Sequence, residues 1–327
     1  MNKEQTVFTS DVEAMNFLVS KTKDLKNEIA KVIIGQEDII NQILISIFAN
    51  GHCLLVGVPG LAKTLLVNTI AQTLGLTYSR IQFTPDLMPS DITGSEILNQ
   101  NREFKFIKGA VFANIVLADE INRTPPKTQA ALLEAMQEHN VTVSGQKHSL
   151  EEPFFVLATQ NPIEQEGTYP LPEAQLDRFM FMLWLDYPTF EQEINILKST
   201  TGSHETVVEK VLSAEDIIMF QKLVRKMPVA DNVYRYVVQL VESTRLNNTN
   251  NVLANKYLSW GAGPRASQYL ILGAKCNAAL NGKYSPDTED VKAVAVSVLR
   301  HRIVLNYTAQ AEGHNAKNII LELINKL

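Results

Sequence analysis

The sequence predicts an α/β fold, in which a parallel sheet covered by helices is followed by a smaller all-helical domain. Up to residue 188, short apolar runs alternate with segments of helical spacing, which is typical of parallel sheets. Beyond the turn composition Asp186-Tyr187-Pro188-Thr189, strand patterns fade and helical patterns dominate. A chain of 327 residues also exceeds one typical core. We therefore expect a helical leader at 1–30, a core at 31–188 and a helical domain at 189–327.

The composition is that of an ordinary soluble globular protein, with 45% apolar and 20% charged residues. The 30 basic and 35 acidic residues give a formal net charge of −5, and basic runs are no longer than a pair such as Arg225-Lys226. A nucleic-acid-binding surface is therefore not visible in the sequence, although a local basic pore in a ring would escape this test.

Two helical patterns and a short apolar connection come first. Apolar residues at helical spacing predict a helix over 10–31 and a second helix over 37–49. The segment Val32 to Gln36 between them has two interpretations. It is either a connection with buried aliphatic side chains or an apolar wall for a purine ring, and the second is favoured because a phosphate loop follows. Ile33 and Ile34 are then the candidate contacts of the ring.

A buried strand, a tight loop and a helix N-terminus follow. The apolar run Cys53-Leu54-Leu55-Val56 precedes the loop. Backbone N–H groups and the positive end of the helix dipole converge at the loop, which suits the phosphates of a nucleotide. We expect Lys63 to reach the β- and γ-phosphates and Thr64 to coordinate Mg²⁺; the alternative is an ordinary turn with a solvated lysine. The loop residues are Gly57, Val58, Pro59, Gly60, Leu61, Ala62, Lys63 and Thr64.

One loop position departs from the general pattern G-x-x-x-x-G-K-[ST], because Ala62 stands where the pattern has its second glycine. A Cβ atom penalises the left-handed backbone region, so an alanine is harmless at this position only if its φ is negative. Gly57 and Gly60 would then supply any positive φ that the turn requires.

The segment between two predicted strands carries an insertion. Thr77 to Phe83 alternates as a strand should. Beyond it, β-like pieces at Glu96–Leu98 and Phe104–Phe106 flank the turn composition Asn99-Gln100-Asn101-Arg102. We expect a β-hairpin at about 94–109 in place of a simple crossover helix. Such an insertion usually contacts another molecule, although a decorated surface loop is equally consistent with the sequence.

A strand of buried type, Asn114 to Glu120, ends in two carboxylates. A carboxylate at the end of an apolar strand is unfavourable unless it has a partner, and the hydrated Mg²⁺ of a nucleotide would be that partner for Asp119. Glu120 would accept a hydrogen bond from the attacking water and orient it towards the γ-phosphate. A mere strand end is the alternative, but the position after a phosphate loop favours the functional interpretation.

A helix, a second hairpin and another strand follow. Helical spacing over 127–138 precedes Val141-Thr142-Val143 and a turn at Ser144-Gly145, which together predict the hairpin. The buried strand at 154–159 leads to Asn161, which lies where ligands bind in open parallel sheets. Its amide would help to hold the attacking water, and the alternative is an asparagine that opens a turn before proline.

The last core strand and the helical domain complete the chain. A short helix at Leu171–Phe179 leads into a strand at 180–185. In the helical domain, Pro264 begins a helix and Arg265 lies in its first turn, where a cation opposes the helix dipole, so we expect an anion beside it. The helical patterns cover 190–199, 214–226, 230–246, 265–281, 287–301 and 316–326.

Cysteine, histidine and terminal patterns exclude several classes of protein. Cys53 and Cys276 are far apart in predicted core elements, so we expect no disulfide framework or zinc site. The six histidines are scattered, so we expect no protein-ligated metal beyond the Mg²⁺ of a nucleotide. The N-terminus is polar and acidic, and the longest apolar run, Phe179 to Leu185, is too short for a membrane span. We expect a cytoplasmic protein without membrane insertion.

The motifs occur in the order of an AAA+ ATPase, and the chain closely resembles the MoxR family from about residue 30 to its C-terminus. The resemblance implies an αβα nucleotide-binding core with a parallel sheet, followed by a helical lid, with ATP and Mg²⁺ bound between them. Ala62 is usual in that family. The matching segments are Gly57–Thr64, which matches the Walker A loop, Ile115–Glu120, Ala158–Pro162, Glu166–Phe179 and Gly263–Ala266.

The resemblance also implies a role for each polar site residue. Asp119 and Glu120 match the Walker B pair, and Asn161 matches sensor 1. Arg178 matches the arginine finger, which acts in the site of a neighbouring subunit, so hydrolysis would require a ring such as the family's hexamers. Arg265 matches sensor 2 on the lid, where it would report the γ-phosphate and couple hydrolysis to domain motion.

Partners are implied in the same way. The hairpin at 94–109 matches the helix-2 insert and 140–149 matches the insert before sensor 1, and both generally face the pore or the substrate side of a ring. The leading hypothesis is chaperone-like remodelling or maturation of partner complexes, with a von Willebrand factor A domain protein as partner. The alternatives are a nucleic-acid-directed AAA+ motor, against which the acidic balance weighs, a chelatase-type motor subunit, and an assembly protein that binds ATP without turnover.

Overall fold

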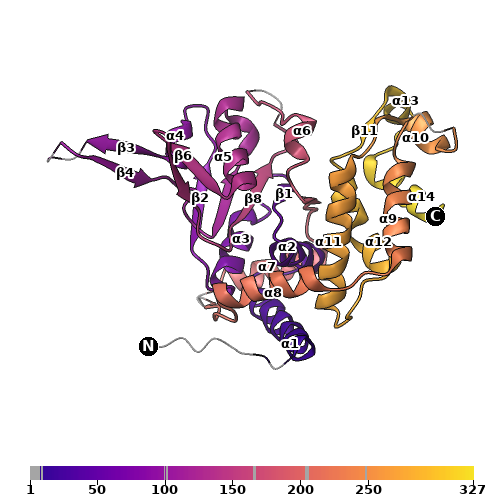
Figure 1. The fold of residues 1–327 in the computed structure, drawn as a ribbon, viewed down its shortest axis with the longest axis horizontal. Helices are drawn as coiled ribbons and strands as arrows, with labels where there is room; N and C mark the ends of the chain where they lie inside the picture. Colours follow the sequence, from indigo (N-terminus) through magenta and orange to yellow (C-terminus); the bar gives the residue numbers. More distant parts are fainter. Residues whose placement is uncertain are drawn as a thin grey trace.

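A computed structural model describes residues 8, 10–98, 100, 102–164, 167–202, 206–246 and 249–327. A sheet-containing core lies beside a group of helices formed by the C-terminal part of the chain (Figure 1). Asn99 and Asn101 of the predicted turn, and Glu166 of the predicted motif, lie outside the described residues. Within the described part of the chain, every helix is too short or too polar to cross a membrane.

Five parallel strands form the central sheet in the order β2-β5-β8-β1-β9. The three inner strands β5, β8 and β1 are buried almost throughout, which is why they read as continuous apolar runs rather than as alternating patterns. The parallel sheet predicted from the sequence is thereby confirmed. The strands are β1 Cys53–Val56, β2 Tyr78–Gln82, β5 Ile115–Asp119, β8 Phe155–Gln160 and β9 Phe181–Trp184.

Helices cover both faces of this sheet. Leu55 of β1 packs into a core shared with α1, α2, α3 and the C-terminal helices, whereas Leu54 faces a second core that includes α4 and α5. The alternation of side chains along a strand thus produces the three-layer αβα arrangement. The covering helices are α1 Asp11–Ala30, α2 Glu37–Phe48, α3 Lys63–Thr73, α4 Pro89–Thr93 and α5 Pro126–Glu138, with shorter pieces η1 Ile121–Arg123 and α6 Glu173–Leu176.

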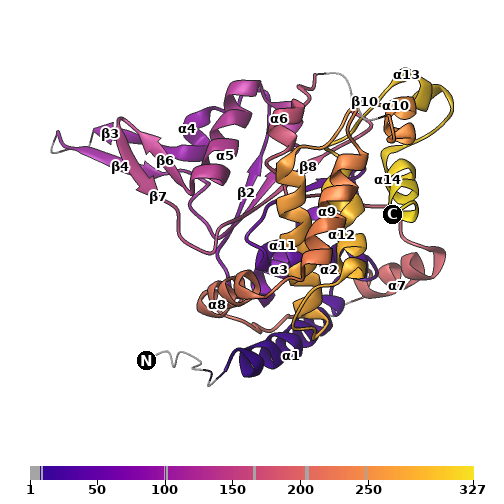
Figure 2. The same ribbon diagram turned by 45° about the vertical axis from the view of Figure 1, so that its right-hand side comes forward.

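Two antiparallel hairpins project from the core on the side away from the C-terminal helices (Figure 1 and Figure 2). Both hairpins confirm the sequence-based expectation, and the second turns at Ser144 and Gly145, which have positive φ. The ring of Phe106 in the first hairpin stacks on His148 in the second, with centroids 3.8 Å apart. The strands are β3 Gly94–Leu98, β4 Phe104–Lys108, β6 Asn140–Val143 and β7 Gln146–Ser149.

The C-terminal part of the chain is a helical domain that packs beside the sheet. Its long helices match the predicted ones. Two short helices and a two-stranded ladder were not predicted, because two to six residues are too few to show a period. The elements are α7 Phe190–Thr200, α8 Ala214–Lys226, α9 Asp231–Ser243, α10 Val252–Tyr257, β10 Leu258–Trp260, α11 Pro264–Leu280, α12 Thr288–Leu299, β11 Val304–Leu305, α13 Tyr307–Ala311 and α14 Ala316–Asn325.

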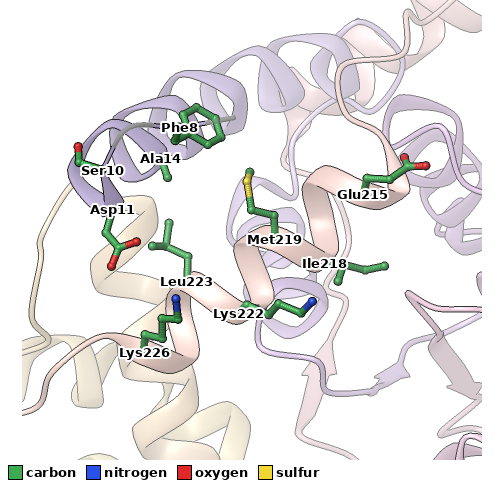
Figure 3. A pocket seen from close by; sticks show the side chains of 10 residues that line it. All are labelled: Phe8, Ser10, Asp11, Ala14, Glu215, Ile218, Met219, Lys222, Leu223 and Lys226. Carbon is green, nitrogen blue, oxygen red and sulfur yellow. The ribbon is translucent and has the colours of Figure 1, made fainter. Parts of the chain in front are cut away.

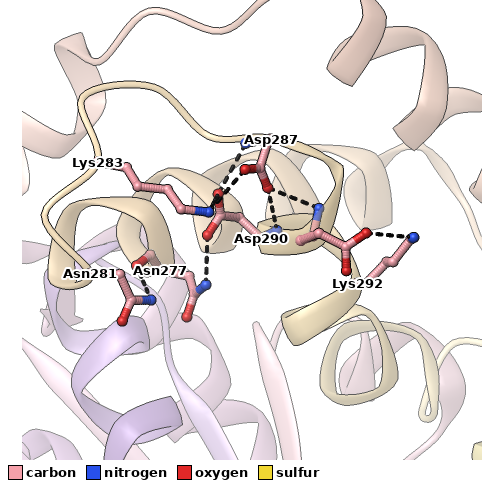
Figure 4. Close-up of polar contacts among 7 residues, drawn as sticks. Asn277, Asn281, Lys283, Asp287, Asp290 and Lys292 are labelled. Atoms are coloured by element: carbon pink, nitrogen blue, oxygen red, sulfur yellow. Dashed lines mark hydrogen bonds and ion pairs between the residues drawn. The ribbon is translucent and has the colours of Figure 1, made fainter.

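A polar network fixes the junction between α11 and α12 (Figure 4). The buried Asp290 carboxylate accepts hydrogen bonds from Asn277 Nδ2 at 2.9 Å and from Lys283 Nζ at 3.0 Å. Asp287 caps α12, since its Oδ1 accepts from the backbone N–H of Asp290 at 3.1 Å. The network therefore sets how the two helices pack against each other, and with it the place of the residues at their far ends.

His52 ties two layers together where β1 begins. Its Nδ1 accepts a hydrogen bond from the Val156 N–H at 3.1 Å, so its Nε2 is the donor to the Met136 carbonyl oxygen at 3.1 Å. The ring therefore links the end of α5 to the start of β8. Burial of His52 lowers its pKa from 6.5 to about 4, because a protonated ring would be a cation held away from water.

The neutral His52 ring predicts a loss of stability in acid. Above its unfolded-state pKa of 6.5 the ring is neutral in both states. As pH falls from 6.5 to about 4, only the unfolded chain takes up the proton, so the free energy of unfolding decreases by about 3 kcal/mol in total. Denaturant titrations at a series of pH values measure this slope.

The variant His52→Gln tests the assignment. Its unfolding free energy should depend less on pH over the same window, with the remaining slope including that of the buried His301, whose pKa burial also lowers. A slope equal to that of the unmodified protein would contradict the assignment to His52.

Candidate functional site

The phosphate loop runs from the end of β1 to the first turn of α3. Gly60 has a φ of 87°, and a Cβ atom added there would meet nothing within 4 Å, so the loop bends around open space. Ala62, the residue before α3, has a φ of 54°, and Gly57 is not among the positive-φ residues. The condition under which the alanine would be harmless, a negative φ, is therefore not met, and Gly60 alone of the two loop glycines has a positive φ. The entry into α3 requires a left-handed residue at this position, and alanine carries the smallest side chain that bears the penalty.

Lys63 points back into the loop that precedes it. Its Nζ donates a hydrogen bond to the Gly57 carbonyl oxygen at 2.6 Å. Burial lowers the pKa of Lys63, and the negative charges of Asp119 and Glu120 oppose that lowering. The ammonium group and both carboxylates are therefore close enough to act on one another. Thr64 lies next in the chain, half-buried in the first turn of α3.

Asp119 ends β5 as a buried carboxylate with two partners. Its Oδ1 accepts from Thr159 Oγ1 at 2.7 Å, and its Oδ2 accepts from Arg80 Nη2 at 2.6 Å. The charge can be buried because it is both paired and hydrogen-bonded. Sequence reasoning missed both partners. The alternation along β2 places Arg80 and Gln82 on one face, which is the only sequence signal for Arg80.

Glu120 leaves the strand with a left-handed backbone, at a φ of 58°. Its Oε2 accepts hydrogen bonds from Gln82 Nε2 at 2.9 Å and from Arg123 Nη1 at 2.8 Å, and its backbone N–H donates to Thr159 Oγ1 at 2.8 Å. A non-glycine residue held at positive φ by several contacts is typical of functional sites. The turn aims the Glu120 side chain away from the strand direction and towards Gln82 and Arg123, neither of which the sequence singled out.

Asn161 follows β8, the strand between β5 and β1. The neighbouring Gln160 carbonyl oxygen accepts a hydrogen bond from the Gly57 N–H at 3.2 Å, so this segment borders the phosphate loop. The buried Asn161 accepts from the Ile163 N–H at 3.2 Å through its Oδ1. Its oxygen is thus used in the turn before proline, and its amide nitrogen is the atom left to donate to a ligand. The two interpretations of Asn161 are therefore compatible.

Arg178 and Arg265 lie together at the opposite edge of the sheet. Both line one cavity of about 170 Å³, whose walls also include His52 and Tyr269. His52 precedes β1 and Arg178 precedes β9, so the cavity lies where the strands begin, whereas Lys63 lies where β1 ends. Arg265 therefore does not face the phosphate loop of its own chain, and its role as a reporter of the γ-phosphate stays a prediction. The C-terminal helices pack so that α11 begins beside the segment of Arg178.

The anion predicted beside Arg265 is Asp177. Its Oδ2 accepts from Arg265 Nη1 at 3.2 Å, and its Oδ1 accepts from Arg302 Nε at 2.7 Å. One carboxylate of the core thus binds two guanidinium groups of the C-terminal domain, which offsets the unfavourable cation at the start of α11.

The segment predicted to form a purine wall is apolar and at least partly buried at Ile33 and Ile34. Ile33 is buried in the core, and Ile34 is half-buried. Gly35 and Gln36 next to them have positive φ, and Gln36 Oε1 is buried without a hydrogen-bond partner among the described residues. A buried acceptor without a donor is unfavourable and suits a ligand that carries an amino group. Whether this segment contacts a purine stays a prediction.

The residues at this edge of the sheet fit a magnesium nucleotide. The loop around Gly60 leaves space that backbone N–H groups can face, and Lys63 supplies a cation beside it. Thr64 and Asp119 offer a hydroxyl and a carboxylate, which are the hard oxygen donors that Mg²⁺ prefers. The residues present thus match the chemistry of a triphosphate and its ion.

A larger hollow of about 610 Å³ lies elsewhere, between the start of α1 and α8 (Figure 3). Met219 and Leu223 line it together with Lys222 and Lys226. None of the loop residues 57–64 lines it, so size alone does not identify the site.

The chain is similar to AAA proteins over most of its length. Residues 52–181 match the ATPase family associated with various cellular activities (AAA), and residues 251–323 match the AAA lid domain. Chaperone MoxR1 of Mycobacterium tuberculosis is 45% identical over 297 residues, which cover 90% of this chain and 78% of that protein. The uncharacterized protein YeaC of Bacillus subtilis is 44% identical over 91% of each chain. A crystal structure from Cytophaga hutchinsonii has a TM-score of 0.90, 44% identity and 96% coverage of each chain.

Because Ala62 has a left-handed backbone, replacing it by glycine should affect the free energy of unfolding differently from replacing the helical Ala71 by glycine. Ala62→Gly removes a Cβ from the disfavoured region, so the free energy of unfolding should stay unchanged or rise by up to about 1 kcal/mol. The control Ala71→Gly, at a buried position in the last turn of α3, should lower it by about 1 kcal/mol or more. Denaturant unfolding of both variants measures the difference, and a loss of stability in Ala62→Gly equal to that in Ala71→Gly would contradict the backbone assignment.

Proposed function

Because the chain belongs to the MoxR family of AAA+ ATPases, we propose that it binds ATP with Mg²⁺ and hydrolyses the ATP as a subunit of a ring. We further propose that the cycle drives chaperone-like remodelling or maturation of partner protein complexes in the cytoplasm. The observation that carries this proposal is the convergence of Lys63, Asp119, Glu120 and Asn161 at one edge of the sheet, from strands that are neighbours in space.

Each side chain at this edge has a task that its geometry supports. The loop N–H groups and Lys63 bind and orient the phosphates. Bound Mg²⁺, held by Thr64 and Asp119, would neutralise part of the phosphate charge. Glu120 accepts a hydrogen bond from the attacking water, and Asn161 donates its amide to fix that water or the phosphate. Gln82 and Arg123 hold the Glu120 carboxylate until then.

The two arginines at the opposite edge support hydrolysis between subunits. Arg178 and Arg265 cannot serve the loop of their own chain from the edge where the strands begin. In a ring, which the family suggests to be hexameric, that edge of one subunit would face the phosphates of the next. A guanidinium supplied in this way accelerates phosphoryl transfer by roughly 10³ to 10⁵. We therefore propose that both arginines act in the neighbouring site.

The first hairpin is the surface that favours a protein client. Ile97, Leu98, Phe104 and Ile107 are exposed on it, and Phe104 exposes 75% of its surface. Exposed apolar clusters mark protein contacts rather than phosphate backbones. The hairpin and the net charge of −5 favour a protein partner, such as a von Willebrand factor A domain protein, over nucleic acid. ATP hydrolysis stimulated by DNA but not by protein would reverse this ranking, and a chelatase-type motor subunit remains the closest alternative.

Two substitutions separate binding from turnover. Lys63→Ala should abolish ATP binding, because the phosphates lose their cation. Glu120→Gln should bind ATP with unchanged affinity and lose at least about 10²-fold in kcat, because the amide cannot accept the proton or orient the water. Fluorescent-nucleotide titration and phosphate release measure the two effects, and normal hydrolysis by Glu120→Gln would overturn the assignment of Glu120.

Mixing two inactive variants tests the role of Arg178. Arg178→Ala subunits keep an intact phosphate loop, and Lys63→Ala subunits keep an intact Arg178. If the arginine acts in the neighbouring site, a mixture should recover part of the phosphate release that each variant lacks. Activity that stays at the sum of the two separate variants would show that Arg178 acts within one chain.

A further inference from the structure

The segment that carries Arg178 is bound along its whole backbone by the C-terminal domain. The Arg302 guanidinium donates to the carbonyl oxygens of Asp177 at 3.0 Å, Phe179 at 2.7 Å and Met180 at 3.2 Å. The remaining carbonyl oxygen, that of Arg178, accepts from the Tyr269 hydroxyl at 3.3 Å. Four consecutive carbonyl groups of the core thus accept hydrogen bonds from side chains of α11 and of the turn after α12.

Other contacts of Arg302 strengthen its hold on residues 177–180. Its Nε donates to the Asp177 carboxylate at 2.7 Å, and its guanidinium lies 5.1 Å from the centre of the Tyr269 ring. His301 beside it contacts the Phe179 carbonyl oxygen through Nε2 at 3.0 Å. Arg302 exposes only 6% of its surface, so these bonds are made away from water. A planar guanidinium with fixed donors orients its acceptors more strictly than a flexible ammonium would.

The core itself holds this segment mainly by backbone hydrogen bonds. The Arg178 N–H donates to the Gln175 carbonyl oxygen at 3.2 Å, and the Met180 N–H donates to the His52 carbonyl oxygen at 2.8 Å. The N–H groups of the segment therefore face the core, and its carbonyl groups face the C-terminal domain. A movement of α11 and α12 relative to the sheet would pull on the backbone of Arg178.

We infer that Arg302 is a positioning residue that holds Arg178 in the orientation needed to complete the active site of the neighbouring subunit. The inference rests on the proposed function, since it requires Arg178 to act in that site. The C-terminal domain then controls catalysis in the neighbouring subunit rather than at the phosphate loop of its own chain. This explains why a buried guanidinium is directed at backbone carbonyl groups on both sides of Arg178.

Arg302→Gln is the first test. Because a displacement of about 1 Å at a catalytic group can reduce the rate by about 10², kcat should fall 10-fold to 100-fold. The affinity of the same subunit for fluorescent ATP should be unchanged, because its phosphate loop is intact. Arg300→Gln is the matched control, since Arg300 lies 5.2 Å from the Trp184 ring, outside the contacts to residues 177–180, and its kcat should change less than threefold.

Two further measurements distinguish positioning from a general structural role. Arg302→Gln mixed with Lys63→Ala should recover activity, because the Lys63→Ala neighbour supplies a correctly held Arg178. The double variant Arg178→Ala with Arg302→Gln should be no slower than Arg178→Ala alone, since Arg302 acts only through Arg178. A wild-type kcat in Arg302→Gln, a failure of this mixture to recover, or an additive loss in the double variant would each overturn the inference.

Two further results have a defined meaning: a variant Arg302→Gln that does not fold, and a variant Arg178→Ala that Lys63→Ala does not restore. If Arg302→Gln does not fold, as judged by its ATP affinity, Tyr269→Phe decides, because it removes only the hydroxyl that donates to the Arg178 carbonyl oxygen. A loss of several-fold in kcat that mixing with Lys63→Ala restores supports the inference, and an unchanged kcat overturns it. If Arg178→Ala itself is not restored by Lys63→Ala, the proposed function fails instead, and the two failures are thereby distinguished.

Discussion

The parallel alignment of β1, β5 and β8 is the constraint on which the site depends. Parallel strands end at one edge, so the phosphate loop, Asp119 and Asn161 meet there although they are far apart in the chain. The same alignment sends the residues that precede the strands, including Arg178, to the other edge. One sheet thus separates the groups proposed to bind the nucleotide from the groups that would complete a second site.

Charge at the ligand edge is balanced within the chain. Asp119 binds Arg80, and Glu120 binds Arg123, so neither carboxylate is buried alone. Each pair joins a strand end to a side chain that is at least 41% exposed. Under the proposed function, a bound cation and its water would replace these partly exposed partners.

Besides the apolar cluster that they share, the lid and the sheet-containing core are joined by polar contacts at residues 177–180. Asp177 binds Arg265 and Arg302, and the buried Arg302 binds the backbone on both sides of Arg178. The network of Asp287 and Asp290 fixes the far end of the same two helices, so α11 and α12 act as one body. Because this rigid pair of helices binds one short segment, a change in lid position would change the orientation of Arg178.

The sequence alone determined the parallel sheet, the two hairpins and the long helices, because apolar periodicity and turn chemistry are local signals. Its motifs also singled out residues 57–64, 119, 120 and 161 as the candidate site, because the order of such motifs is written in the chain itself. The tertiary structure decided what depends on distant packing. It set the left-handed φ of Ala62, which the entry into α3 imposes, and it chose Arg80 as the partner of Asp119 through strand register. It also placed Arg265 and Arg302 beside Arg178, since no local pattern fixes how a helical domain packs against a sheet.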